Sequence, residues 1–411
     1  MKLLILSQYF PPEVGAPQNR LFELAVRLHR MGVQVSVLTA MPNYPKMEID
    51  PAYRGVKFLR EEMEGLTVFR SRIYVSKSRS VVSRLRNYFS FVFSSARAGN
   101  RIDQQYDFIL CESPPLFLAY SAMYLARRKR ARLIFNVSDL WPESAEKLGV
   151  VKNKYLLKMA YRLEKRVYER SVLVTGQTNG ICNNIRKRFP VINTYWLPNG
   201  ADLRYFDPSV VSRGPWRAEN NFKPGDFIFL YAGIIGIAQG LEIILEAASR
   251  LKSRRELKFV LMGSGPEKER LTALKESMAL ENVFFAEPVP KQQMPVVLRN
   301  VNATIVPLKK LDIFLGAIPS KIFESLAMEV PVLLGVDGEA RELFVEKGQC
   351  ALYFAPGDPG QLALAIDRLE ADVGLAVSLG KKGREFVNAY FNRDVIAADF
   401  YEQLKKYLQK S

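Results

Sequence analysis

A lysine and a carboxylate lie three residues apart at the start of one short helical segment, and their chemistry suits a nucleotide. The stretch PSKIFESLAMEVPVLLG, residues 319–335, places Lys321 and Glu324 just after Ser320. An ammonium near the positive end of a helix dipole suits a diphosphate, and a carboxylate suits ribose hydroxyls. A surface Lys–Glu pair at this spacing is also common and stabilises a helix only weakly. Motifs elsewhere in the chain have to decide between these two interpretations.

Glycine-rich loops follow several apolar segments of the chain. Glycine lets backbone N–H groups approach a phosphate closely, and a glycine before a helix places those groups at the helix N-terminus. Tight strand-to-helix turns also need glycine for their own geometry, and none of these loops has the dinucleotide spacing GxGxxG. The glycines that we expect to contact a phosphorylated donor are Gly15, Gly233, Gly236, Gly240, Gly263 and Gly265.

The segment DLWPES, residues 139–144, places a carboxylate and a large aromatic side chain after another apolar segment. Asp139 and Trp141 together suit a sugar ring, which presents hydroxyls and an apolar face. The alternative is that Asp139 caps a helix and Trp141 packs. No DxD sequence occurs, and helix capping explains the acidic pair Asp337 and Glu339 better than a metal site does. We therefore predict that no metal is required.

The 411-residue chain carries a formal net charge of +17 and contains a single histidine, His29. The charge predicts an anionic partner, which could be nucleic acid, an acidic membrane or a phosphorylated substrate. One histidine excludes clusters of histidine metal ligands, and three cysteines without a CxxC pair indicate a reducing compartment. The longest apolar stretch has 11 residues, too few for the roughly 20 that span a bilayer, so we expect no transmembrane helix.

A basic and aromatic segment runs from residue 70 to residue 101, with eight Arg or Lys residues and no Asp or Glu. This pattern is typical of an interfacial helix on anionic lipid, and it also occurs in nucleic-acid binding proteins. A helix buried on one side with its arginines in water is the remaining alternative. We expect membrane or acceptor contact at Arg84, Arg86, Phe89, Phe93 and Trp141.

Strand-like and helix-like segments alternate along the chain, which predicts two α/β domains, each with a parallel sheet covered on both faces. A polar stretch over residues 209–224 separates the two runs of strands. In such domains ligands bind beyond the carboxyl ends of the strands, where the motifs above lie. We expect domains over residues 1–205 and 206–390. Residues 391–411 are expected to return to the first domain as a helix.

Five features in order resemble glycosyltransferase family 4, a group of retaining enzymes with the GT-B fold. They are the Gly15 loop with Arg20, DLWPES, LPNGAD, the YAG…QGLE loop and PSKIFESLAMEVPVL. The chain is most similar to bacterial O-antigen and capsule enzymes of the fucosamine-transferase type. The resemblance implies two Rossmann-like doubly wound domains that face a central cleft, with the acceptor on the N-terminal domain and the nucleotide sugar on the C-terminal domain.

The resemblance also assigns roles to single residues. Glu324 matches the second acid of the family motif E-x7-E, which holds the ribose, whereas the first acid is replaced by Gly316. Two basic positions of the family fall on Ile234 and Gln239, so we expect Lys321 to supply part of the lost charge. The further donor-binding residues implied are Arg20, Gln239, Gly316, Ser320, Lys321 and Glu324, and the catalytic residues are Asp139, Lys321 and Glu324.

The sequence therefore predicts a metal-independent glycosyltransferase (EC 2.4) without a cofactor, acting in O-antigen or capsule synthesis. The expected donor is UDP-linked, with an N-acetylated deoxy sugar as one candidate, and the expected acceptor is a polyprenyl-diphosphate-linked glycan. The enzyme is expected in the cytoplasm, at the anionic inner face of the cytoplasmic membrane, with no nucleic acid partner. The alternatives are a UDP-sugar epimerase of the same fold, a basic nucleic-acid-binding protein and a Rossmann oxidoreductase.

Overall fold

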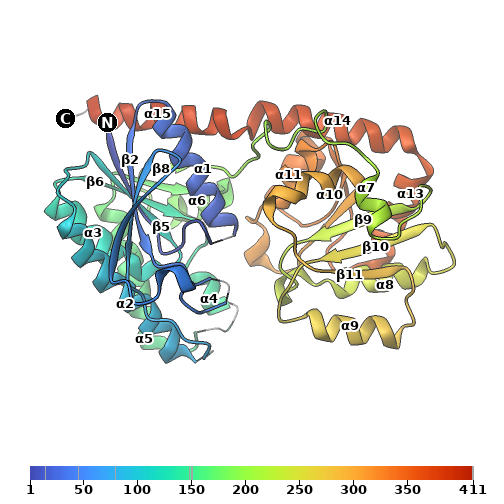
Figure 1. Cartoon of the computed structure of the whole chain (residues 1–411), viewed down its shortest axis with the longest axis horizontal. Coiled ribbons are helices and arrows are strands. Elements are labelled where there is room, and N and C mark those ends of the chain that lie inside the picture. Colours follow the sequence, from blue (N-terminus) through green and yellow to red (C-terminus); the bar gives the residue numbers. More distant parts are fainter. Residues whose placement is uncertain (14, 45, 79, 148, 150, 410–411) are drawn as a thin grey trace. The chain divides into compact units, whose positions relative to one another are not determined.

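The computed structural model describes residues 1–13, 15–44, 46–78, 80–147, 149 and 151–409. The chain divides into two compact units, each built on one sheet (Figure 1). Unit 1 comprises Met1–Asn199 and Asp394–Ser411, and unit 2 comprises Gly200–Arg393. The sequence placed the corresponding boundaries after residues 205 and 390.

Unit 1 holds an eight-stranded sheet in the order β3-β4-β2-β1-β5-β6-β7-β8. All neighbouring strands are parallel except β3 and β4. Because the order runs outward from β1 in one direction and then returns to β5 on its other side, the sheet is doubly wound. The strands are β1 (Lys2–Leu6), β2 (Gln34–Ala40), β3 (Phe58–Met63), β4 (Leu66–Ser71), β5 (Phe108–Ser113), β6 (Arg132–Val137), β7 (Leu173–Gly176) and β8 (Thr194–Trp196).

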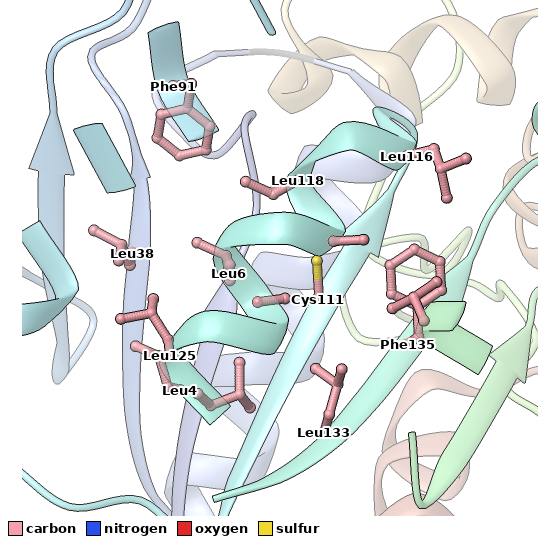
Figure 2. Close-up of a cluster of buried hydrophobic side chains, with 14 of the residues drawn as sticks. Leu4, Leu6, Leu38, Phe91, Cys111, Leu116, Leu118, Leu125, Leu133 and Phe135 are labelled. Atoms are coloured by element: carbon pink, nitrogen blue, oxygen red, sulfur yellow. The ribbon is translucent and has the colours of Figure 1, made fainter. Parts of the chain in front are cut away.

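Helices cover both faces of this sheet, because alternate residues of each strand point to opposite sides. Leu4 and Leu6 of β1 lie in the cluster formed with helices α2, α3, α5 and α6, whereas Leu3 and Ile5 lie in the cluster formed with α1 and α15. Figure 2 shows labelled side chains of the first cluster, with Phe91 of α2 among them. The helices are α1 (Ala16–Arg30), α2 (Val81–Arg101), α3 (Ala119–Arg128), α4 (Glu143–Lys147), α5 (Lys154–Arg170), α6 (Asn179–Arg188) and α15 (Arg393–Gln409).

Local sequence signals set where several of these helices begin. Ser80 caps α2 by accepting a hydrogen bond from the Ser83 backbone N–H at 3.2 Å. Asn153 caps α5 in the same way, with the N–H groups of Tyr155 and Leu156 as donors. Such caps satisfy N–H groups that have no partner within the first helical turn. They fix the residues at which α2 and α5 begin.

Unit 2 holds a six-stranded, all-parallel sheet in the order β11-β10-β9-β12-β13-β14, which is also doubly wound. Its main cluster of buried apolar side chains joins the sheet to α8 and α13. The strands are β9 (Phe227–Ala232), β10 (Leu257–Met262), β11 (Val283–Ala286), β12 (Ala303–Pro307), β13 (Val332–Gly335) and β14 (Ala351–Tyr353). The helices are α7 (Pro215–Glu219), α8 (Glu242–Arg250), α9 (Lys268–Ser277), α10 (Met294–Asn300), α11 (Lys321–Ala327), α12 (Glu339–Arg341), α13 (Pro359–Ala371) and α14 (Val373–Tyr390).

The sequence did not indicate three strands, β3, β8 and β14, and all three lie at the edge of a sheet. β8 and β14 have only three residues each, and β3 reads FLREEM, with no fully buried residue. Edge strands are short and carry charge, so the apolar run that marks a central strand is missing. After β13 the chain forms α12 (Glu339–Arg341), which continues as a π-helical turn, Glu342–Lys347.

The C-terminal helix α15 belongs to unit 1 and not to the unit that precedes it in the chain. Its buried side chains Ile396, Ala397, Phe400 and Leu404 pack in the same cluster as strand β1 and helix α1. Within the described residues, no helix combines the length and the apolar composition that a bilayer crossing requires.

Candidate active site

Unit 2 brings two loops together at the point where its strand order reverses. β9 and β12 lie side by side in the sheet, and the loops after their carboxyl ends run over residues 233–241 and 308–320. The Lys309 backbone N–H donates to the Ala238 carbonyl at 2.9 Å, which joins the two loops directly. Ligands of doubly wound sheets bind at this reversal point, so these loops frame the candidate site.

Lys321 places its ammonium against this pair of loops. Its Nζ lies 3.7 Å from the centroid of the Tyr231 ring, a cation–π contact. A Cβ atom added to Gly233 would come within 2.8 Å of the same Nζ, so the glycine leaves room for the ammonium. Burial lowers the pKa of Lys321 to about 7, although the nearby Glu324 carboxylate acts in the opposite direction. The site therefore holds a half-buried amine whose charged form an anionic ligand would favour.

Gly263 and Gly265 have a structural role that the sequence left as an alternative. Their φ angles of +152° and +157° lie in the region that L side chains rarely adopt. A Cβ on Gly263 would lie 1.8 Å from the Gly233 carbonyl oxygen, and a Cβ on Gly265 would lie 2.3 Å from that of Ile235. These two glycines thus allow the β10 loop to pack against the loop that carries Gly233. Whether they also contact a donor stays a prediction.

The other residues predicted to bind the donor lie on the same two loops and on α11. Gly236 and Gln239 lie in the β9 loop, where a Cβ added to Gly236 would lie 2.9 Å from the Gln239 side-chain oxygen. Ser320 precedes α11 without capping it through its hydroxyl, and Gly316 lies in a turn four residues earlier. Ile234, where the family resemblance implies a basic residue, is 59% exposed. The structure gathers these residues at one end of the unit 2 sheet.

Unit 1 carries a buried polar network at its own reversal point, between β1 and β5. Arg20 of α1 forms an ion pair with Glu112 of β5, with 2.8 Å between Nη2 and Oε1. The Arg20 guanidinium also donates to the Ser138 hydroxyl at 2.7 Å, and Asn136 and Ser138 both donate to the Glu112 carboxylate. Arg20 and Glu112 are 6% and 2% exposed. Arg20, predicted to bind the donor, therefore ties α1 to strands β5 and β6.

Sequence analysis did not single out Glu112. Burial raises the pKa of its carboxyl, while the Arg20 charge and the hydrogen bonds from Ser138 and Asn136 act in the opposite direction. The signal available in the sequence was an acidic residue inside the apolar segment FILCES, which forms a fully buried strand. A charge at such a position requires a buried partner, and that partner, Arg20, is 92 residues away in the sequence.

The predicted sugar-facing residues of unit 1 lie beyond the same strand ends. The Asp139 carboxylate accepts a hydrogen bond from the Ser144 hydroxyl at 2.8 Å, and desolvation raises its pKa. Trp141 packs edge-on against Phe117, with 5.4 Å between ring centroids. Gly15 precedes α1 with extended backbone, and a Cβ there would meet the Gln18 side chain.

The residues predicted to face a membrane lie on α2 and beside it. Arg84, Arg86 and Phe93 are exposed, and Phe89 is half-buried. Phe89 packs against Phe117 in a tilted arrangement, with 5.0 Å between ring centroids, and Phe117 in turn contacts Trp141. The structure thus brings Phe89 and Trp141 together through Phe117, a residue the sequence had not indicated.

One sequence interpretation is wrong. Asp337 does not cap α12, which has no side-chain cap and is preceded by Gly338. The Asp337 carboxylate instead accepts a hydrogen bond from the Tyr353 hydroxyl at 2.5 Å. In the part of the chain that the structure describes, no group of three or more His, Cys, Asp or Glu side chains is placed to hold a metal ion.

Comparison with known families matches both units separately. The model described as glycosyl transferase 4-like domain matches residues 15–200, and the model described as glycosyl transferases group 1 matches residues 212–386. The chain belongs to glycosyltransferase family 4. The family resemblance seen in the sequence motifs is thereby confirmed, and both matches coincide closely with the two units of the structure.

Two curated relatives of this transferase have names from bacterial polysaccharide synthesis. The putative colanic acid biosynthesis glycosyl transferase WcaI of Escherichia coli K12 is 26% identical, covering 98% of this chain and 100% of that protein. The O-antigen chain mannosyltransferase C of Escherichia coli is 20% identical, covering 74% of this chain and 72% of that protein.

Solved structures confirm the fold class of the transferase as GT-B. Sucrose-phosphate synthase from Thermosynechococcus elongatus superposes with a TM-score of 0.76 at 19% identity, covering 100% of both chains. HepE of Anabaena, solved in complex with UDP-glucose, superposes with a TM-score of 0.72 at 15% identity, also covering 100% of both chains. At these identities the structural similarity shows the fold alone.

Proposed function

We propose that this transferase is a retaining enzyme that moves a sugar from a UDP-sugar to a lipid-linked glycan during synthesis of a cell-surface polysaccharide. The names of the curated relatives, which include colanic acid and O-antigen enzymes, support the pathway class. The solved complexes of HepE with UDP and with UDP-glucose support the nucleotide. In this proposal unit 2 binds the donor and unit 1 binds the acceptor.

The observation that carries the proposal is the Lys321 ammonium beside the β9 loop. It lies against Gly233, in the loop after the first strand of a doubly wound sheet, where a diphosphate is expected. The family's two basic positions fall on Ile234 and Gln239 in this same loop, so Lys321 would provide the charge that they lack. Glu324, one turn further along α11, would hold the ribose hydroxyls.

The proposed reaction is a front-face displacement that needs no metal and no histidine base. The bond between the sugar and the diphosphate breaks while the acceptor oxygen attacks from the same face. The departing diphosphate takes the acceptor proton, and Lys321 stabilises the negative charge that develops on it. Asp139, whose carboxylate is held by Ser144, would orient the acceptor or the donor sugar.

The acceptor proposal depends on helix α2, which buries several polar side chains and exposes several apolar ones. Its buried side includes Ser83, Asn87 and Ser95, and the Ser95 hydroxyl bonds Ser121 of α3. Its exposed side includes Val82 and Phe93, which are 67% and 72% exposed. A helix that buries serines and exposes valine and phenylalanine beside arginines suits contact with an anionic bilayer. A polyprenyl-linked acceptor would reach unit 1 from that surface.

Calorimetric binding of UDP, GDP and ADP, each with and without Mg²⁺, tests the donor proposal. Of the three nucleotides, we expect only UDP to bind, and we expect it to bind equally well without Mg²⁺. Lys321→Ala and Glu324→Ala should each weaken binding about tenfold or more, whereas Lys252→Ala, an exposed lysine outside both loops, serves as the control. Binding of no nucleotide, or binding that both variants retain in full, would contradict the proposal.

A further inference from the structure

An open groove of about 1080 Å³ lies on unit 1, between the β3–β4 hairpin and the second half of α2. Four cationic side chains line it and no carboxylate does: Lys57, Arg72, Arg97 and Arg101. Its volume lies just above the usual range of small-molecule sites. None of the residues predicted to bind the donor lines it.

The charge environment of the four groove cations contrasts with that of Arg254. Arg254, for comparison, forms ion pairs with Glu256, Asp367 and Glu370. Within the part of the chain that the structure describes, the four groove cations form no ion pair with a carboxylate, and all four are exposed. Cations brought together without a counter-charge repel one another, so an anion that binds between them is favoured.

Hydrogen bonds hold the two walls of the groove together. The Ser90 hydroxyl of α2 accepts from the Tyr74 backbone N–H at 2.8 Å, and the Ser94 hydroxyl donates to the Arg72 carbonyl at 2.6 Å. Ser90, Ser94, Arg97 and Arg101 are spaced four, three and four residues apart, which places them along one side of the helix. Arg72 and the two arginines of α2 therefore line the groove from two segments that are hydrogen-bonded to each other.

The lining also includes four aromatic side chains: Phe58, Tyr74, Phe93 and Tyr124. The Arg101 guanidinium lies over the Phe58 ring, with 5.9 Å to its centroid, and Tyr124 is held by a 2.7 Å hydrogen bond from Asn100. Phe93, the most exposed phenylalanine of α2, lies at the rim of the groove and also on the proposed membrane-facing side of the helix. Guanidinium groups beside apolar rings suit a ligand with a phosphate and a hydrocarbon portion.

We propose that this groove binds the head group of an acidic phospholipid, with the phosphate on Arg72, Arg97 and Arg101 and the start of the acyl chains along Phe93. This inference rests on the proposed membrane contact of α2. It adds a defined head-group site to a surface that otherwise requires only charge and apolar area. The guanidinium forks would make paired hydrogen bonds to the phosphate oxygens, which lysine side chains cannot reproduce.

The test uses dihexanoyl phosphatidylglycerol as monomers in solution, measured by calorimetry on the full chain. Wild type should bind this lipid saturably. It should bind dihexanoyl phosphatidylcholine and glycerol 3-phosphate at least tenfold more weakly. Arg97→Gln with Arg101→Gln should weaken binding about thirtyfold, from the loss of two cations beside an anionic lipid. Arg97→Lys with Arg101→Lys keeps the charge and should still weaken lipid binding severalfold. Lys252→Gln with Arg255→Gln, two exposed cations of unit 2, is the control for net charge.

Each contrary result has one meaning. No saturable binding by wild type, or equal binding by the glutamine pair, would overturn the head-group site. If the lysine pair retained full lipid affinity, the groove would be a diffuse basic patch and not a head-group site. If glycerol 3-phosphate bound as tightly as the lipid, the ligand would be a soluble phosphate. Flotation with phosphatidylglycerol vesicles distinguishes a failure of the head-group site from a failure of the proposed function. If wild type fails to float but binds UDP, the membrane contact fails and the donor proposal stands.

Discussion

Lys321 shows at the scale of one residue how an ordinary side chain acquires a property suited to a site. Its ammonium lies over the Tyr231 ring, and Gly233 is small enough to admit it. Removing an amine from water disfavours its charged form, which is why its pKa falls to about 7. A bound diphosphate would favour the charged form and raise the pKa again.

We expect UDP affinity to fall about tenfold between pH 7.5 and pH 9. The sign follows from the lowered pKa: above about pH 7 the free protein has lost the Lys321 proton, so binding must take one up. The terminal phosphate of UDP is already ionised over this range. Calorimetry in buffers of different ionisation enthalpy measures the proton uptake directly. Lys321→Gln should bind more weakly and with little pH dependence, and an equally steep dependence in that variant would exclude Lys321 as its source.

The buried pair Arg20–Glu112 makes a second prediction at this scale. Glu112→Ala would leave the Arg20 charge buried without its partner, so we expect the free energy of unfolding to fall by about 3 to 5 kcal/mol. Denaturant titration of the variant measures the loss. Replacing both partners, as Arg20→Met with Glu112→Leu, should be less destabilising than Glu112→Ala alone. The opposite order would show that the pair does not act as a unit.

At the scale of elements, the β9 and β10 loops are fastened together through backbone contacts. The Gly233 N–H donates to the Met262 carbonyl, and the Ile235 N–H donates to the Ser264 carbonyl, each at 2.9 Å. A side chain at residue 263 would separate them, because the atom that it meets is backbone and cannot rotate away. The loop that carries Gly233 thus takes its position from its neighbour.

Gly263→Ala should therefore destabilise the protein by about 2 to 4 kcal/mol, from backbone strain together with the clash. It should also weaken UDP binding, because Gly233 moves. Gly225→Ala is the matched control, since nothing lies within 4 Å of its Cβ position and its φ is not in the positive region. Thermal unfolding of both variants, followed by UDP titration, makes the comparison. Equal stability of the two variants would remove the packing role assigned to Gly263.

At the scale of the whole molecule, both units are doubly wound sheets with their candidate residues at the point of strand reversal. In unit 1 that point lies between β1 and β5, where Arg20 meets Glu112. In unit 2 it lies between β9 and β12, beside Lys321. The chain then returns to unit 1 through α15, so the first unit is completed only by residues that follow the second unit in the chain.

We expect Phe400→Ala to destabilise unit 1 selectively, by about 3 to 5 kcal/mol, because the side chain is fully buried against that unit's sheet. Hydrogen exchange followed by mass spectrometry should show lost protection in peptides of β1 and α1, with β9 and β12 unchanged. Tyr390→Ala, whose side chain is 62% exposed on α14, is the control. Loss of protection in unit 2 alone would contradict the assignment of α15.

The sequence by itself determined the fold class, the family and most central strands, because alternating apolar runs, glycine loops and motif order are local properties of the chain. It determined neither the edge strands, which lack a continuous apolar run, nor the buried side of α2, where serine and asparagine replace the usual apolar residues. Only the tertiary structure decided that Arg20 pairs with Glu112 and that Lys321 lies over Tyr231. These pairs join residues about 90 positions apart, and no spacing along the chain encodes such a contact; the packing of strands and helices does.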